Sequence, residues 1–240
     1  MFLLALTTAP VRTADLVSVI VRDVSVLDPT GSHWLTHRDI VITDTTITAV
    51  RPSGAALPPA KTTIYGAGKF AIPGLFDNRA ALSRFTRDTA ALFVAVGVTS
   101  VRDTGSDPSQ IAEWRRDIAY GKFMGPRIVG VCASASGDCA ARADALPQAP
   151  HEDMARLVRE GRKPAAALRA ATLESAQLNG RAKDLGSIEP GKIADVLILT
   201  GDPLTDIRHT AAIDAVIFRG EALTRAHLNM LVARAAGAKR

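Results

Sequence analysis

The sequence of 240 residues lacks features that define several classes of protein. It contains two cysteines and 5% aromatic residues, so it is not a disulfide-dense scaffold. The longest apolar run, residues 90–98, includes a glycine and is far shorter than the roughly 18 to 20 residues of a membrane span. We therefore expect no transmembrane helix. The composition of 47% hydrophobic and 22% charged residues is typical of one large or two small globular domains.

Basic residues exceed acidic ones by 29 to 24, which gives a formal net charge of +5. Arginine and lysine are scattered rather than clustered, so we expect no nucleic-acid binding. Residues 1–6 (MFLLAL) are apolar but lack the basic start and the length of a signal peptide. A cytoplasmic location is favoured, and export stays open if residues 1–6 are the remnant of an export signal. Cys132 and Cys139 fit neither a zinc knuckle nor a CxxC pair.

The first seventy residues alternate with the two-residue period of strands. The runs at 16–21 and 24–27, broken at residues 28–31, predict a hairpin, and the runs at 38–43 and 46–50 repeat the pattern. Residues 63–65 predict a further strand after a proline-bounded loop. Residues 66–68 (GAG) form a turn and precede no helix that could bind a phosphate.

From residue 70 strands alternate with helical segments, which is typical of parallel βα units. Strands are predicted over residues 70–76, 99–102 and 127–131. One helix is expected over 84–96, ending at Gly97, and another from Pro108, capped by Ser106 or Asp107, to about Gly121.

Residues 132–150 have the composition of a linker, rich in Ala, Ser, Gly and Pro. Helices are predicted over 152–160 and 164–178, strands over 193–199 and 215–219, and an amphipathic helix over 222–235.

Several motifs resemble the amidohydrolase superfamily, in particular its imidazolonepropionase-like and prolidase-like branch. They are residues 68–77 (GKFAIPGLFD), 97–103 (GVTSVRD), 125–127 (GPR), 167–172 (ALRAAT), 185–195 (LGSIEPGKIAD) and 201–204 (GDPL). The resemblance covers roughly residues 16–131 and 152–225.

The resemblance implies a metal-dependent hydrolase of C–N bonds, acting on non-peptide or dipeptide substrates. It also implies a (β/α)₈ barrel beside a small β-sandwich built from both chain ends. One or two divalent ions, zinc among them, activate water in such enzymes. The family's ligands are a His-x-His pair on the first strand, a carboxylated lysine or a glutamate on the fourth, histidines on the fifth and sixth, and an aspartate on the eighth.

This sequence departs from that pattern. Arg79 and Ala81 occupy the positions expected for the histidine pair, and neither side chain can ligate a metal. Residues 70–184 supply only three to four βα units at about 31 residues each. We therefore expect an incomplete TIM-like barrel over 70–184, with a linker at 132–150, and a composite β-sandwich from residues 1–69 and 185–240. No metal site and no bound cofactor are expected, with zinc the candidate if the resemblance extends to function.

Asp77 and Asp103 follow predicted barrel strands, where barrel enzymes place their chemistry. Capping of the next helix, or pairing with Arg79 or Arg102, explains them more simply. Cys132 also follows a strand and is favoured as unreactive, since no histidine lies near it in the sequence. Ser134 and Ser136 lack the context of a catalytic serine.

The five histidines form no metal-binding pattern. His33 and His37 flank a turn, where their i,i+4 spacing does not converge on a metal. His151 to Asp153 lie at a predicted helix start, where capping and compensation of the helix dipole are favoured over catalysis. His209 and His227 are expected to be exposed.

The leading hypothesis is a degenerate, catalytically inactive amidohydrolase. One alternative is an active hydrolase whose site is completed by another subunit or chain, for example with Asp77, Asp103 and Arg79. The other is a non-enzymatic interaction module. We expect a homodimer, or a second chain that supplies the missing strands, because a partial barrel leaves its edges uncovered.

Overall fold

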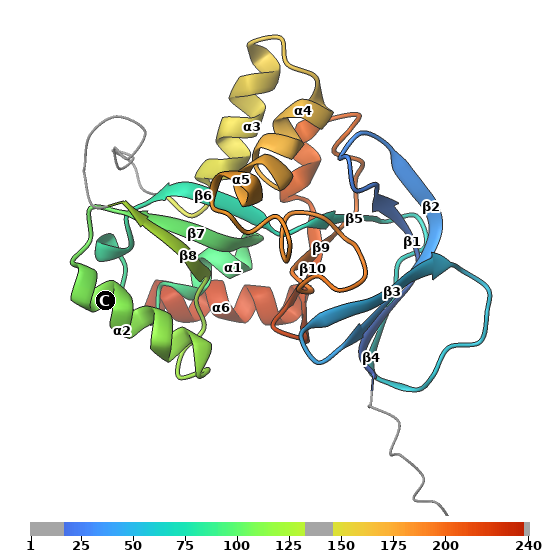
Figure 1. Cartoon of the computed structure of the whole chain (residues 1–240), viewed down its shortest axis with the longest axis horizontal. Helices are drawn as coiled ribbons and strands as arrows, with labels where there is room; N and C mark the ends of the chain where they lie inside the picture. Colours follow the sequence, from blue (N-terminus) through green and yellow to red (C-terminus); the bar gives the residue numbers. More distant parts are fainter. Residues whose placement is uncertain (1–16, 133–145, 238–240) are drawn as a thin grey trace, which may run out of the picture.

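A computed structural model describes residues 17–132 and 146–237, whose strands form two sheets in a mixed α/β fold (Figure 1). The larger sheet has eight strands in the order β11-β10-β9-β5-β1-β2-β3, with β4 paired to β1, and the smaller has the order β6-β7-β8. The strands are β1 (Val17–Leu27), β2 (Trp34–Thr43), β3 (Thr46–Pro52), β4 (Ala60–Tyr65), β5 (Phe70–Pro73), β6 (Leu75–Ala80), β7 (Val98–Thr104), β8 (Arg127–Cys132), β9 (Val196–Leu199), β10 (Ile213–Phe218) and β11 (Glu221–Thr224). The α-helices are α1 (Ala91–Ala95), α2 (Pro108–Ala119), α3 (Ala149–Arg159), α4 (Pro164–Ala170), α5 (Leu173–Leu178) and α6 (Arg225–Gly237), with 3₁₀ helices at Leu82–Arg84 (η1) and Ile207–Ala211 (η3).

Strand β1 organises the N-terminal part of the larger sheet. It pairs antiparallel with β2 and in parallel with β4 and β5. The apolar runs at 16–21 and 24–27 belong to this one strand. Register shifts between Val21 and Val26, with Asp23 at a φ of 55°, accommodate the irregularity between them. The predicted hairpin is the one that β1 forms with β2.

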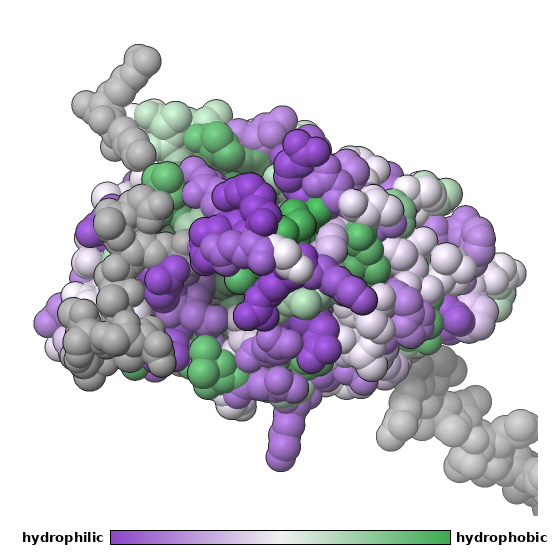
Figure 2. Space-filling view, turned by 90° about the horizontal axis from the view of Figure 1, so that it is seen from above, coloured by the Kyte–Doolittle hydropathy of each residue, from purple (hydrophilic) through white to green (hydrophobic). Residues whose placement is uncertain are grey.

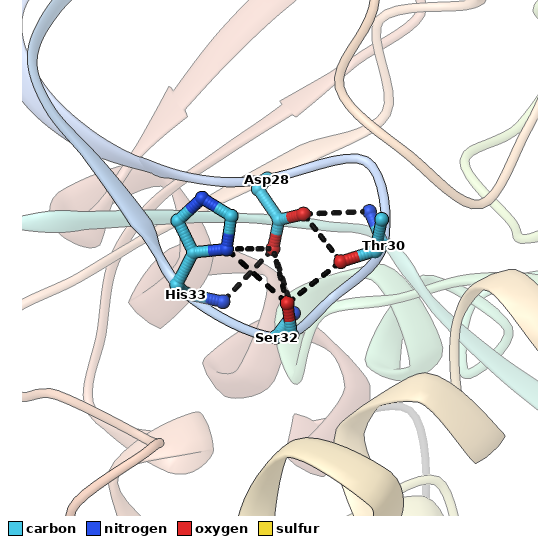
Figure 3. Close-up of polar contacts among 4 residues, drawn as sticks. All are labelled: Asp28, Thr30, Ser32 and His33. Atoms are coloured by element: carbon cyan, nitrogen blue, oxygen red, sulfur yellow. Dashed lines mark hydrogen bonds and ion pairs between the residues drawn. The ribbon is translucent and has the colours of Figure 1, made fainter.

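The turn after β1 is organised by the carboxylate of Asp28 (Figure 3). Its Oδ2 accepts a hydrogen bond from the backbone N–H of Thr30 at 2.9 Å, and its Oδ1 accepts from those of Ser32 at 2.7 Å and His33 at 2.8 Å. Burial by itself raises the pKa of a carboxyl group. Here the hydrogen bonds outweigh burial and hold the pKa of Asp28 well below its usual range.

The C-terminal part of the chain completes the larger sheet. Strand β9 pairs antiparallel with both β5 and β10, and β10 pairs with β11. The segment before β9 also bonds to the N-terminal hairpin: the Ile47 N–H donates to the Lys192 carbonyl at 2.8 Å, and the Ala194 N–H donates to the Thr45 carbonyl at 2.8 Å. Strands from both parts of the chain therefore share one sheet.

The single strand predicted over residues 70–76 is wrong, because two strands of different sheets lie there. Strand β5 joins the larger sheet, whereas β6 pairs in parallel with β7. Gly74 lies between them, and a Cβ atom at this position would lie 2.1 Å from Thr99 Oγ1. Pro73 has no N–H with which to extend the ladder of β5, so the chain changes sheets at this dipeptide.

The helix predicted from Pro108 is confirmed as α2. The side chain of Asp107 caps it by accepting hydrogen bonds from the N–H groups of Ser109 and Gln110. The helix predicted over 84–96 is much shorter than expected and consists of α1 alone, although it ends before Gly97 as predicted. Thr89 Oγ1 accepts a hydrogen bond from the Thr86 N–H at 2.8 Å, which diverts the backbone from a helical path.

Of the three remaining helix predictions, that over 152–160 corresponds to α3, and the other two need correction. The segment 164–178 is divided into α4 and α5, because the Ala171 carbonyl accepts a hydrogen bond from the Phe76 N–H of β6 at 2.9 Å. The segment 222–235 begins as β11, since Arg219 and Gly220 both have positive φ and make the two-residue turn that returns a strand onto β10.

Most of the expected linker over 132–150 lies outside the described residues, and Ala149 and Pro150 are the first residues of α3. In the part of the chain that is described, no helix has both the length and the apolar character required to cross a bilayer.

Two hydrophobic cores flank the strands near the C-terminus. One lies between β6, β7, β8 and the helices, and it includes Leu197 and Leu199 of β9. The other is formed mainly by side chains from strands of the larger sheet and includes Val196 and Ile198. Successive residues of a strand point to opposite faces, so β9 contributes to both cores.

The Asp28 turn gives a test of the fold. We expect Asp28→Asn to lower the free energy of unfolding at pH 7 by about 2 kcal/mol, since hydrogen bonds to an ionised acceptor are lost. The pKa of Asp28 is lowered by folding, so its contribution is present above the unfolded pKa and declines as the pH falls. In urea unfolding, the difference in the free energy of unfolding between the wild type and Asp28→Asn should therefore be smaller at pH 3 than at pH 7. Asp88→Asn, at an exposed carboxylate, is the control and should have little effect; an equal effect would contradict the assignment.

Candidate functional site

The main candidate site is a cavity of about 450 Å³ beside the carboxyl-terminal halves of β6 and β7. Asn78 and Arg79 of β6 and Arg102 of β7 line it from the sheet, and residues of α3, α4 and α5 close it. Figure 2 looks onto the α3–α4 end of the molecule, where hydrophilic side chains surround small hydrophobic patches. The volume is suitable for a small molecule.

Positive charge predominates in this cavity. Arg79, Arg102 and Arg156 line it, together with the carboxylate of Asp153. Asp153 is shared, since its oxygens lie 3.7 Å from Arg79 Nη2 and 3.4 Å from Arg156 Nη2. Apolar walls, among them Phe76, complete a pocket that favours an anionic ligand over a cation.

Asp77 and Asp103 lie on the paired strands β6 and β7 but do not line the cavity. Oδ1 of Asp77 accepts a hydrogen bond from the Arg79 N–H at 2.9 Å. Oδ1 of Asp103 accepts from the Leu82 N–H at 2.9 Å and from the Ser106 hydroxyl at 2.7 Å. Both carboxylates thus organise the backbone that follows their strands.

The residues at the end of β6 do not fit a metal ion of the kind expected from the motifs. Arg79 lines the cavity, whereas Ala81 is 3% exposed and offers no donor atom. The amide of Asn78 is engaged with α5: it donates to the Ser175 hydroxyl at 2.7 Å and accepts from the Asn179 side chain at 2.8 Å. Within residues 17–132 and 146–237, no group of three or more His, Cys, Asp or Glu side chains could hold a metal.

His33 and His37 do not converge, as expected from the turn between them. The exposed ring of His33 lies beside Asp28, whereas Nδ1 of His37 lies 2.8 Å from Asp23.

Residues 151–153 make no capping hydrogen bond, because α3 begins earlier, at Ala149, but Glu152 lies in its first turn, where a negative charge complements the helix dipole as expected. His151 instead joins α3 to two neighbouring segments. Its Nδ1 lies 2.9 Å from Thr210 Oγ1 and its Nε2 lies 2.8 Å from the Val96 carbonyl oxygen. Burial lowers the pKa of His151, despite the opposing carbonyl, and favours the neutral ring. The sequence pattern missed this structural role because both partners are distant along the chain.

The remaining candidates are also accounted for by local structure. His227 is exposed as expected, but His209 is half-buried, and its Nδ1 lies 3.0 Å from the Asp202 carbonyl oxygen. Cys132 is disulfide-bonded and has no free thiol. Residues 66–68 form a turn that leads into β5, with Gly68 at a φ of 74°. Ser134, Ser136 and Cys139 lie outside the described residues.

Comparison with known proteins shows which proteins this architecture resembles. Residues 134–223 match the model of the amidohydrolase family. The match covers less than half of the chain, so it shows a likeness to that family over this segment. No curated protein sequence matches the chain.

Solved structures resemble this amidohydrolase-like chain over most of its length. Molinate hydrolase is 14% identical with a TM-score of 0.76, and the match covers 90% of this chain and 97% of that one. Phenylurea hydrolase B is 14% identical with a TM-score of 0.74, covering 88% and 98%. A putative prolidase from Bifidobacterium longum is 16% identical with a TM-score of 0.69, covering 92% and 100%. At these identities the likeness shows the fold.

Sequence reasoning missed one buried ion pair of this amidohydrolase-like chain. Asp195, the last residue of the LGSIEPGKIAD motif, is 5% exposed, and its Oδ1 lies 3.5 Å from Nη2 of Arg127 on β8. Burial raises the pKa of Asp195 to about 6, although the charge of Arg127 acts in the opposite direction. The pair connects the segment before β9 to the parallel sheet.

This ion pair predicts a characteristic pH dependence. Because the folded pKa is raised, the contribution of Asp195 to stability is full below its unfolded pKa, near 4, and is lost as the pH rises through about 6. We expect the stability of the wild type relative to Asp195→Asn to fall by up to about 3 kcal/mol between pH 4 and pH 7, measured by urea unfolding.

The matched control is Asp184→Asn. Its hydrogen bond with Arg181 lowers the pKa of Asp184, so its contribution is nearly complete above the unfolded pKa, and the stability of the wild type relative to this variant should change little between pH 4 and pH 7. A difference between the wild type and Asp195→Asn that does not change with pH would contradict the raised pKa.

Proposed function

We propose that this protein is a degenerate amidohydrolase that does not hydrolyse its ligand through a metal centre. The family match supports a hydrolase-like ancestry. The motifs resemble those of enzymes that hydrolyse C–N bonds. The observation that carries the proposal is the position of Arg79, whose guanidinium group lines the cavity at the end of β6. A permanent positive charge there disfavours a divalent cation.

The architecture supports this proposal. Three parallel strands, β6-β7-β8, supply the start of a barrel, and α3, α4 and α5 follow without the further strands that would carry the remaining ligands among the described residues. In this proposal residues 70–184 form a partial barrel. Residues 1–69 and 185–240 form the composite β-domain, supported by the pairing of β9 with β5.

The partner we propose is a second copy of this chain. Within the described residues β8 pairs with β7 and with no strand on its other side, and Val131 of β8 is 39% exposed. An open strand edge with an apolar side chain favours association. A site completed by that copy and an interaction module without catalysis are the two alternative functions, and both would use this edge.

A disulfide bond bears on the cellular compartment of the protein. Disulfides persist mainly in oxidising compartments, so the disulfide at Cys132 supports export over the cytoplasmic location favoured by the sequence.

The loss of the metal centre can be tested directly. We expect the purified protein to contain no stoichiometric zinc, manganese or iron by elemental analysis. We also expect Arg79→His/Ala81→His to remain at background when assayed with zinc and manganese against acyl-dipeptides, lactones and cyclic ureides. Two imidazoles alone lack the remaining ligands and an oriented base.

The single variant Arg79→His and circular dichroism of both variants control for misfolding at the buried Ala81. Metal-dependent turnover well above the wild-type background, in a folded double variant, would show that other ligands are supplied and would support the shared-site alternative.

The proposed association is tested at the edge of β8. Light scattering at micromolar concentration should show a dimer of the wild type, and Val131→Lys should shift the population towards monomer because a charge would be buried in the interface. Met230→Lys, at a residue of α6 that is 59% exposed, is the matched control and should remain dimeric. A monomeric wild type, or equal dissociation of both variants, would contradict an interface at β8.

A further inference from the structure

A second cavity, of about 360 Å³, lies where β8 begins, and it shares no lining residue with the candidate site. Four arginines line it from four different segments: Arg115 of α2, Arg127 of β8, Arg181 after α5, and Arg219 in the turn after β10. We infer that this cavity binds a small organic phosphate, independently of any catalytic role of the first cavity.

The charges around the cavity are only partly balanced by the protein. No carboxylate is among its lining residues. Asp195 lies beside Arg127 at 3.5 Å, and Asp184 accepts a hydrogen bond from Arg181 Nε at 3.1 Å. Two of the four guanidinium groups therefore have a carboxylate neighbour outside the cavity lining.

The other two arginines hydrogen-bond to backbone carbonyl groups. Arg115 Nε donates to the Ile128 carbonyl at 3.1 Å, and Arg219 Nη2 donates to the Ala119 carbonyl at 2.7 Å. Like charges that converge on one cavity repel each other, and an anion with two charges relieves this repulsion. A phosphate monoester carries about that charge near neutral pH.

Unused donors remain for such a ligand. Arg115 uses Nε for its carbonyl contact, which leaves its terminal nitrogens available to the cavity. Nε of Arg127 is buried and has no hydrogen-bond partner within the described part of the chain. Planar guanidinium groups bind phosphate oxygens through paired N–H donors.

The size and the walls of the cavity indicate that the phosphate carries an organic group. A volume of about 360 Å³ exceeds that of a single phosphate ion and lies in the range of small-molecule sites. Ile118, Ile193 and Phe218 add apolar surface to the lining. The ligand class is therefore a phosphate monoester with a compact apolar body.

Isothermal titration calorimetry with phenyl phosphate at low ionic strength tests this assignment. We expect saturable binding to the wild type, weaker binding of inorganic phosphate and no binding of phenol. Arg115→Gln should weaken the binding of phenyl phosphate about tenfold or more, because a hydrogen bond between charged partners is lost. Arg115 is exposed on α2, so this variant should fold normally.

The matched control is Arg116→Gln, the neighbouring exposed arginine of α2, which lies beside Asp117 and does not line the cavity. It should bind phenyl phosphate like the wild type. Arg181→Gln is a second variant within the cavity and should weaken binding as Arg115→Gln does, with circular dichroism to check its fold because Arg181 also hydrogen-bonds to Asp184. Absence of saturable binding, or equal weakening by Arg115→Gln and Arg116→Gln, would overturn the assignment; the latter would show diffuse surface attraction rather than a site.

Discussion

The structure depends on the burial of β9 on both of its faces. The four residues Val196 to Leu199 are completely buried and alternate between the two cores. Along its edges the same strand pairs with β5 from the first third of the chain and with β10 from the last. A strand held in this way cannot shift register without moving its apolar side chains from one core to the other, so it fixes the larger sheet against the parallel sheet.

The position of the first cavity follows from this constraint. Strand β5 is anchored by β9, and the chain crosses at Gly74 directly into β6, which carries Asn78 and Arg79 to the cavity. The Phe76 N–H of β6 then bonds to the Ala171 carbonyl between α4 and α5. The strand and the helices that enclose the cavity are thereby connected. This arrangement preserves the location that barrel enzymes use for chemistry, while the side chains present there favour an anion over a metal ion.

The arginine residues are scattered in the sequence but are brought together by the fold. The basic residues are dispersed along the chain and indicate only a modest net charge of +5. In three dimensions, Arg79, Arg102 and Arg156 meet in one cavity, and four other arginines meet in the second. The local charge in each cavity is therefore set by convergence of distant segments, which no count along the sequence measures.

The sequence by itself determined the local features of this protein. Asp107 and Pro108 start α2, Gly97 ends α1, and the absence of a metal-ligating atom in the side chains of Arg79 and Ala81 is visible without a structure. These features depend on short-range chemistry: capping hydrogen bonds, backbone conformation and the presence or absence of a donor atom.

Only the tertiary structure decided how the segments meet. It divided residues 70–76 between two sheets at Gly74, because Thr99 of another strand leaves no space for a side chain there. It also paired Asp195 with Arg127 and placed His151 between Val96 and Thr210. Each of these outcomes depends on packing between residues far apart in the chain. The periodicity of the sequence does not specify which distant residue a side chain contacts.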